Sequence, residues 1–246
     1  MPHIDIAAEK IFSLGALNVT NAYLHSVGAV FVIIFFSLLI SLRLALIPSI
    51  LQGSLEYIVS GTLNLMTGVM GSKEKAEKYA PIVLAIFFLV LVSNWLGILP
   101  GVGSIGFYEE VEGHRLLIPL FRSAGSDLNF TLALGVTVMI LVNIFGAASI
   151  GMTNHLKKFF SFKGPIDFFV GILELISEGA KAVSFSFRLF GNIIAGEVLL
   201  VIIFFLVPYG APIPFLGLEI FVGFIQALVF AMLTMVFIAI ATTEHH

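Results

Sequence analysis

Residues 184–197 read SFSFRLFGNIIAGE, and they place one permanent charge, Arg188, inside an apolar run that extends over residues 166–207. An arginine at membrane depth costs several kcal/mol to insert. Its guanidinium does not escape that cost by losing a proton. We therefore expect a carboxylate to be presented to Arg188, and that carboxylate can belong to another polypeptide.

The composition around this run is that of a membrane protein. The 246 residues are 59% hydrophobic and 11% charged, and the mean hydropathy is +1.10. Soluble domains carry about 25% charged residues. The apolar runs are long enough for membrane helices and too continuous for barrel strands. The sequence therefore predicts an all-α integral membrane protein.

Several function classes are excluded by what the sequence lacks. It has no Cys, so disulfides and thiolate metal sites are ruled out, and its six His show no metal-ligand spacing. It has no basic cluster for nucleic acid, no Gly-rich phosphate loop and no Ser/His/Asp set. We expect no enzyme active site, no cofactor and no metal.

Five membrane-crossing helices are predicted in a single membrane domain, at residues 27–47, 81–99, 128–152, 166–207 and 215–243. Residues 1–26 lack the positive n-region of a signal peptide, so we expect an external N-terminal segment before a retained first span. Residues 48–71 repeat apolar positions at helical spacing with polar ones between them. That pattern predicts an amphipathic interfacial helix, with a short sixth crossing as the alternative.

The loop charges predict the orientation. Three lysines follow the predicted interfacial helix and three follow the third span, namely Lys73, Lys75, Lys78, Lys157, Lys158 and Lys163. The loop after the second span is acidic. The positive-inside rule then places the N-terminus outside and the C-terminus in the cytoplasm.

The last two spans are too long to stand upright. Straight helices over residues 166–207 and 215–243 would measure roughly 63 Å and roughly 43 Å, against a hydrocarbon thickness of about 30 Å. The connection at residues 208–214 reads PYGAPIP, which no helix continues through. We expect a strongly tilted hairpin.

Polar side chains form one stripe on the first of these two long helices. They fall within an arc of roughly 100° at 3.6 residues per turn, and they are Glu174, Ser177, Glu178, Lys181, Arg188 and Asn192. Glu197 lies outside the arc, and we expect it to face Glu219 and Gln226, which share a face of the last span. Two polar groups would then open toward opposite sides of the membrane, with Arg188 between them. This layout suits a protein that hands a proton to a moving partner.

The residues Arg188 to Asn192, followed by AGE at 195–197, resemble subunit a of the F-type ATP synthases. Residues 94–100, 127–134 and 226–230 extend the resemblance. It implies a membrane stator subunit whose two long tilted helices wrap a ring of c subunits, each bearing a carboxylate. Arg188 would attract that carboxylate as it arrives and would prevent a direct passage of protons across the membrane.

The resemblance also implies roles for other residues. Asn192, Glu197, Glu219 and Gln226 would form an outer half-channel, and the inner half-channel residues would be Glu174 and Ser177. Implied partners are the c-subunit ring, the peripheral-stalk b subunits and the remainder of the complex, in a bacterial inner membrane. Some relatives carry His where this chain has Glu219, which leaves open the pH at which the outer group titrates. The coupling ion, proton or sodium, is also open.

Other polar residues have plainer interpretations. We expect an internal Glu178–Lys181 pair, interhelical hydrogen bonds from Asn94 and Asn143, helix-start roles for Asp127 and Asp167, and an Arg43 that snorkels to the interface. Two other functions remain to be distinguished. A free-standing secondary transporter is disfavoured because we find no internal repeat. A passive membrane anchor would not depend on the carboxylates.

Overall fold

The computed structural model describes residues 8–15, 17–42, 44–99, 101–103, 105–111, 114–159 and 164–243. Within them, five helices are long and apolar enough to cross a membrane: α1 (Asn21–Ser41), α3 (Lys73–Ile98), α4 (Leu128–Ile150), α6 (Pro165–Leu206) and α7 (Pro212–Ala241). The predicted fold class is confirmed. The expectations for Arg43 and Lys163 lie outside the described residues.

Shorter elements connect these helices. They are α2 (Ile50–Met70), α5 (Met152–Phe159), the 3-10 turn η1 (Ala124–Ser126) and two antiparallel hairpins, β1 (Lys10–Leu14) with β2 (Leu17–Thr20) and β3 (Gly106–Val111) with β4 (His114–Pro119). Neither hairpin nor α5 was predicted. The strands have only four to six residues each, which is too short for an alternating pattern to stand out in the sequence.

Side-chain caps determine where several helices begin. Thr20 accepts a hydrogen bond from the backbone N–H of Tyr23, and Ser72 accepts one from that of Lys75. These caps start α1 and α3 well before the apolar runs at residues 27 and 81. Asp127 caps α4 through the backbone N–H of Asn129, and Asp167 lies in the first turn of α6, as predicted.

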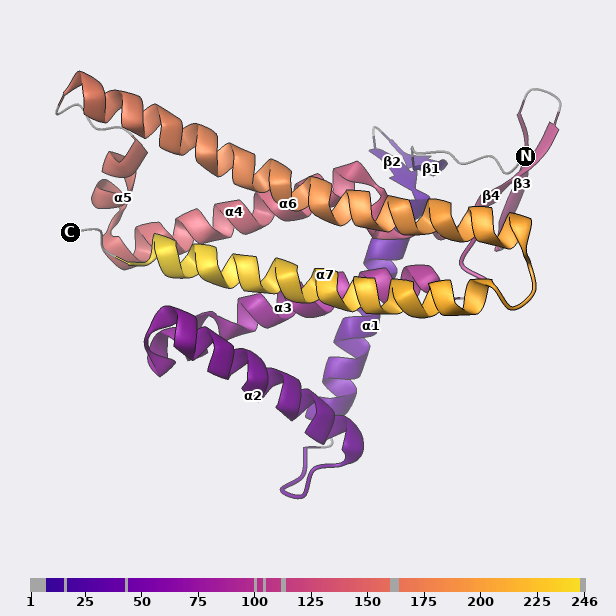
Figure 1. Cartoon of the computed structure of the whole chain (residues 1–246), viewed down its shortest axis with the longest axis horizontal. Coiled ribbons are helices and arrows are strands. Elements are labelled where there is room, and N and C mark those ends of the chain that lie inside the picture. Colours follow the sequence, from indigo (N-terminus) through magenta and orange to yellow (C-terminus); the bar gives the residue numbers. More distant parts are fainter. Residues whose placement is uncertain are drawn as a thin grey trace.

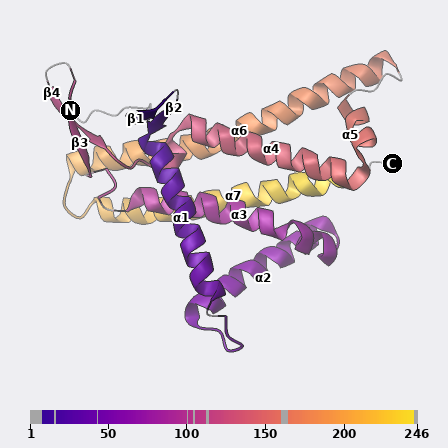
Figure 2. The ribbon, with the colours of Figure 1, turned by 180° about the vertical axis from the view of Figure 1, so that it is seen from behind.

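The two longest helices run beside each other along the long dimension of the molecule (Figure 1). Toward its N-terminus α6 diverges from α7, and α5 lies near that open end. Helix α4 packs against α6, and α3 packs against α7. Helix α1 crosses the direction of these helices in both views (Figures 1 and 2), while α2 packs on α3 and α7.

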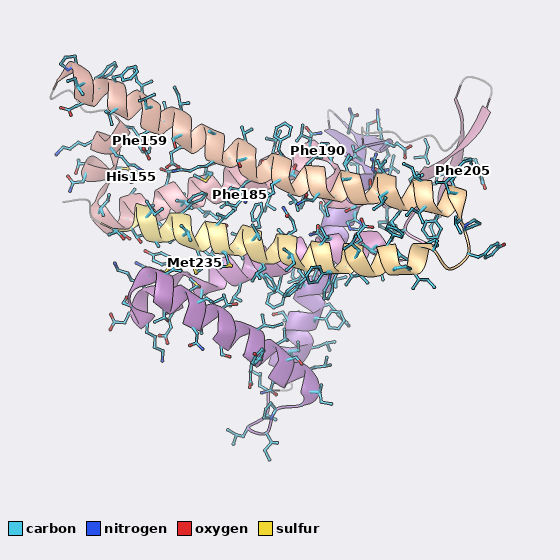
Figure 3. The ribbon with its side chains drawn as sticks, viewed as in Figure 1. His155, Phe159, Phe185, Phe190, Phe205 and Met235 are labelled. Atoms are coloured by element: carbon cyan, nitrogen blue, oxygen red, sulfur yellow. The ribbon has the colours of Figure 1, made fainter. Side chains whose placement is uncertain are left out.

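The core lies among α3, α4, α6 and α7. Phe185 of α6 and Phe230 of α7 meet edge to face, with ring centroids 4.6 Å apart, and Figure 3 shows Phe185 on the α7 side of its helix. Asn94 donates a hydrogen bond to the Gly223 carbonyl oxygen over 3.2 Å, which confirms its predicted interhelical role. A Cβ at Gly135 of α4 would lie 2.9 Å from the Ala182 carbonyl oxygen, so this glycine permits the close α4–α6 approach.

Candidate functional site

Arg188 lies near the middle of α6 with its side chain exposed, although the next residue, Leu189, is buried. In the part of the chain that the structure describes, its guanidinium makes no hydrogen bond or ion pair. Several exposed residues near it on α6 are small, among them Ser184, Gly191 and Ala195. The charge is therefore left open to a neighbour outside this chain.

One turn further along α6, a hydrogen bond joins the two long helices. The Asn192 side-chain Nδ2 donates to Oε1 of Gln226 on α7 over 2.8 Å. Gln226 is only 4% exposed, and its Nε2 has no hydrogen-bond partner among the described residues. The Gln226 Nε2 donor is thus buried next to the exposed Asn192.

Glu219 approaches α6 at a glycine. A Cβ at Gly196 would collide with the Glu219 carboxylate in its present position, so the glycine leaves room for that carboxylate against the helix. The Oε2 atom of Glu219 is buried and has no hydrogen-bond partner in the described ranges. Glu219 also interacts electrostatically with Glu197, which lies next to Gly196. The two carboxylates are therefore neighbours.

Glu197 has a cationic partner that sequence reasoning missed. Its Oε2 lies 3.6 Å from Nη2 of Arg122, in the segment between β4 and η1. The Nε of Arg122 donates to the Ser126 hydroxyl over 3.2 Å. In the sequence, Arg122 is one basic residue of an acidic loop, and no spacing rule connects it to a helix residue so far along the chain.

Unpartnered polar atoms continue from this group into the interior. Ser93 Oγ, Asn94 Oδ1 and Ser123 Oγ are buried and make no hydrogen bond within the described part of the chain. A Cβ at Gly125 would lie 3.4 Å from Asn94 Oδ1, so α3 and η1 meet there. Buried polar atoms are normally satisfied, often by water. Their concentration here marks a polar interior at the junction of α3, η1, α6 and α7.

A second polar group lies near the N-terminal end of α6. The Glu174 Oε1 atom is 2.7 Å from Nζ of Lys158 on α5. The Glu178 Oε1 atom is 2.8 Å from Lys181 Nζ and 3.7 Å from Lys158 Nζ, so the predicted Glu178–Lys181 pair is confirmed. Ser177 is half-buried on the same helix and makes no hydrogen bond with the described residues.

His155 of α5 extends this second group, and sequence reasoning missed it as one of six scattered histidines. It is 5% exposed, and its Nε2 lies 3.0 Å from Asn143 Oδ1 (Figure 3 locates His155). The Asn143 Nδ2 donates to Glu178 Oε2 over 3.4 Å, as its predicted interhelical role requires. Burial and the nearby Lys158 ammonium lower the pKa of His155, while Glu178 opposes them.

Comparison with known proteins identifies the family. The family described as ATP synthase A chain matches residues 23–239. The chain belongs to this family. A similar relative is "ATP synthase subunit a" of Campylobacter jejuni, 33% identical over 227 residues that cover 91% of each chain. Others are the Campylobacter concisus protein of the same description (35% identical, 82% of each chain) and "ATP synthase subunit a 3" of Pelobacter propionicus (32% identical, 95% of this chain and 94% of the relative).

In this member of the ATP synthase A chain family, the two polar groups are well separated. One group lies where α4, α5 and α6 meet, and it is called the inner group after the side of the membrane predicted for it: Glu174, Ser177, Glu178, Lys158, Asn143 and His155. The outer group, defined as Asn192, Gln226, Glu197, Glu219 and Arg122, lies toward the α6–α7 turn. Glu174 and Asn192 are about 27 Å apart along the helix axis. Arg188 lies between the groups, closer to the outer one.

Proposed function

We propose that this chain is the proton-translocating stator subunit of an F-type ATP synthase and that it offers two offset half-channels to a rotating ring. One observation carries the proposal: an exposed guanidinium without a partner in the described chain lies between two separate polar groups on one long helix. The family membership supports the same role.

The outer group suits the first half of the path. Asn192 and Gln226 are joined by a hydrogen bond across the two long helices, and Glu197 and Glu219 lie further along the same helices toward the α6–α7 turn. Carboxylates can take up and release protons, whereas amides do not titrate but can hold water molecules through hydrogen bonds. A proton entering from outside would reach a carboxylate of a c subunit at Asn192, the exposed end of this group.

Arg188 would act on the rotor carboxylate through its charge. A deprotonated carboxylate in a low-dielectric surrounding is strongly attracted to a guanidinium. It would be held near Arg188 until it takes up a proton from the outer group, after which the neutral acid can move into lipid. The fixed positive charge would also repel a proton moving directly between the half-channels.

The inner group suits release to the cytoplasm. Glu174 and Ser177 lie on α6 some turns before Arg188, and Glu174 is paired with Lys158 at the start of the long helix. A carboxylate that reaches this level after a turn of the ring would lose its proton toward Glu174. The c-subunit ring, the b subunits and the remainder of the complex are the proposed partners, in a bacterial inner membrane.

The exposed faces of the long helices fit such a ring. Beside Arg188, α6 exposes Phe187, Gly191 and Ala195, and α7 exposes Phe221 and Ile225. Small and apolar residues allow another helix to approach closely in lipid. The passive-anchor alternative makes a different prediction, because it expects Glu174, Glu197 and Glu219 to be dispensable for activity.

The test is Arg188→Ala in the assembled complex, assayed in inverted membrane vesicles. We expect proton-driven ATP synthesis to fall to background while immunoblots show the chain at normal abundance in the membrane. Lys73→Ala is the matched control, because it removes an exposed cation whose described ion pair is with Glu77 alone. Normal coupled synthesis in the Arg188→Ala vesicles would exclude the proposed role.

A further inference from the structure

A cavity of about 670 Å³ opens where the start of α3 meets the ends of α4 and α7, and no residue of either polar group lines it. It is lined by Lys75, Lys78, Tyr79, Ala148, Ser149, Ile150, Thr242 and Thr243. Ligand sites generally have volumes of roughly 300–1,000 Å³. We propose that this cavity binds the headgroup of a membrane phospholipid, with the phosphodiester on the lysines and a hydrogen-bond donor of the headgroup on the opposite wall.

The lysines provide the anion-binding side. Lys75 and Lys78 are exposed and have no ion pair with any residue that the structure describes, whereas nearby Lys73 is paired with Glu77. The Lys78 ammonium lies 5.3 Å from the centre of the Tyr79 ring, which orients it beside the cavity. Two ammonium groups at one opening give a phosphate both charge and donors.

The other wall offers acceptors. The hydroxyls of Thr242 and Thr243 donate to the carbonyls of Ile238 and Ala239 in their own helix, each over 2.7 Å. Their oxygens therefore remain as acceptors toward the cavity. Helices α4 and α7 also end here, and helix C-termini carry partial negative charge. A singly charged phosphodiester can bind the lysines while its glycerol or ethanolamine group donates hydrogen bonds to the threonine side. A doubly charged free phosphate would be repelled more strongly by the partial negative charge of the helix C-termini.

An apolar track leads away from the cavity, as an acyl chain requires. Ala148 lines the cavity, and Ile144 and Ile140 follow at four-residue intervals along α4, all three exposed. Tyr79 closes the inner side through its hydroxyl, 3.0 Å from the Ser149 hydroxyl. The loop charges place this end of the bundle at the cytoplasmic surface, where basic pockets between membrane helices bind anionic headgroups.

The test uses the full chain, delipidated in detergent and titrated with phosphatidylglycerol in native mass spectrometry. We expect Lys75→Gln/Lys78→Gln to weaken binding of the tightest lipid by roughly tenfold or more. Lys73→Gln/Lys157→Gln removes the same charge outside the cavity and should leave that affinity unchanged. Ala148→Trp keeps every lysine but fills the cavity, and it should also abolish the tightest binding.

Two further probes separate the sources of phosphate and the role of the donor. Inorganic phosphate at millimolar concentration should not displace the lipid, and phosphatidylcholine, which has no donor, should bind more weakly than phosphatidylglycerol. Equal affinities of the two lysine-pair variants would overturn the proposal. So would lysine-dependent displacement by inorganic phosphate, an unchanged Ala148→Trp variant or equal binding of phosphatidylcholine. None of these readouts depends on proton conduction.

Discussion

His155 is a residue whose protonation the fold resists, because its imidazole is buried and faces the ammonium of Lys158. Glu178 on α6 opposes that effect, and Glu174 is paired with Lys158. The net result is a pKa below the ordinary value of about 6.5. As the pH falls below about 6.5, His155 takes up a proton more readily in the unfolded chain than in the folded one. The free energy of unfolding therefore decreases as the solution becomes acidic.

We therefore expect thermal unfolding in detergent to shift to lower temperature between pH 7.5 and pH 5.5 in the parent chain. His155→Gln should show a smaller shift, because glutamine does not titrate and its amide can still donate to Asn143 Oδ1. The two chains are compared by the difference between the two pH values, which removes any general loss of stability from the substitution. Identical differences would contradict the assigned protonation behaviour.

Contacts between residues close in the sequence could be predicted, whereas contacts formed by the tertiary fold could not. The Asp127 cap and the Glu178–Lys181 pair were predictable, because both depend on neighbours a few positions away. The contact of Glu197 with Arg122 was not, since it joins a helix to a loop through the tertiary fold. The same holds for His155 with Asn143, because α5 itself was not expected.

At the scale of helices, close approach between α4 and α6 depends on a missing side chain. A Cβ at Gly135 would press on the Ala182 carbonyl and on Ser186, whereas one at Gly61 of α2 would meet nothing within 4 Å. Gly135→Ala should destabilise the protein by about 1–3 kcal/mol through overpacking. Gly61→Ala should stabilise it by roughly 0.5–1 kcal/mol, as alanine does in a helix interior.

Denaturant or thermal unfolding of the purified chain measures both variants, and the opposite signs are the result to be checked. A Gly135→Ala chain as stable as the Gly61→Ala chain would mean that α4 and α6 are not in close contact. The helices themselves were more predictable than this contact. The run at 166–207 matches α6 (Pro165–Leu206) almost residue for residue, because prolines and glycines flank it, whereas packing distances follow only from the assembled bundle.

For the whole molecule, the number of crossings depends on α2. The structure joins the start of α1 to the end of β4, since the Asn21 Nδ2 atom donates to the Pro119 carbonyl oxygen over 3.4 Å. The two β-hairpins therefore lie at the same end of the bundle. Five crossings, with α2 along the interface, keep both hairpins on the outer side. A sixth crossing by α2 would send β1 and β2 to the opposite side and break that contact.

The absence of Cys from the sequence makes this testable with single introduced cysteines. We expect Ser13→Cys in β1 and Tyr108→Cys in β3 to react with a membrane-impermeant maleimide in intact cells. Lys157→Cys in α5 should react only in inverted vesicles, because the positive-inside rule predicts that the lysine-rich loops face the cytoplasm. If α2 crossed the membrane, Ser13→Cys would change sides while Tyr108→Cys would not. Labelling of one hairpin alone in intact cells would therefore reject the five-crossing arrangement. Labelling of both hairpins would show that α2 does not cross the membrane.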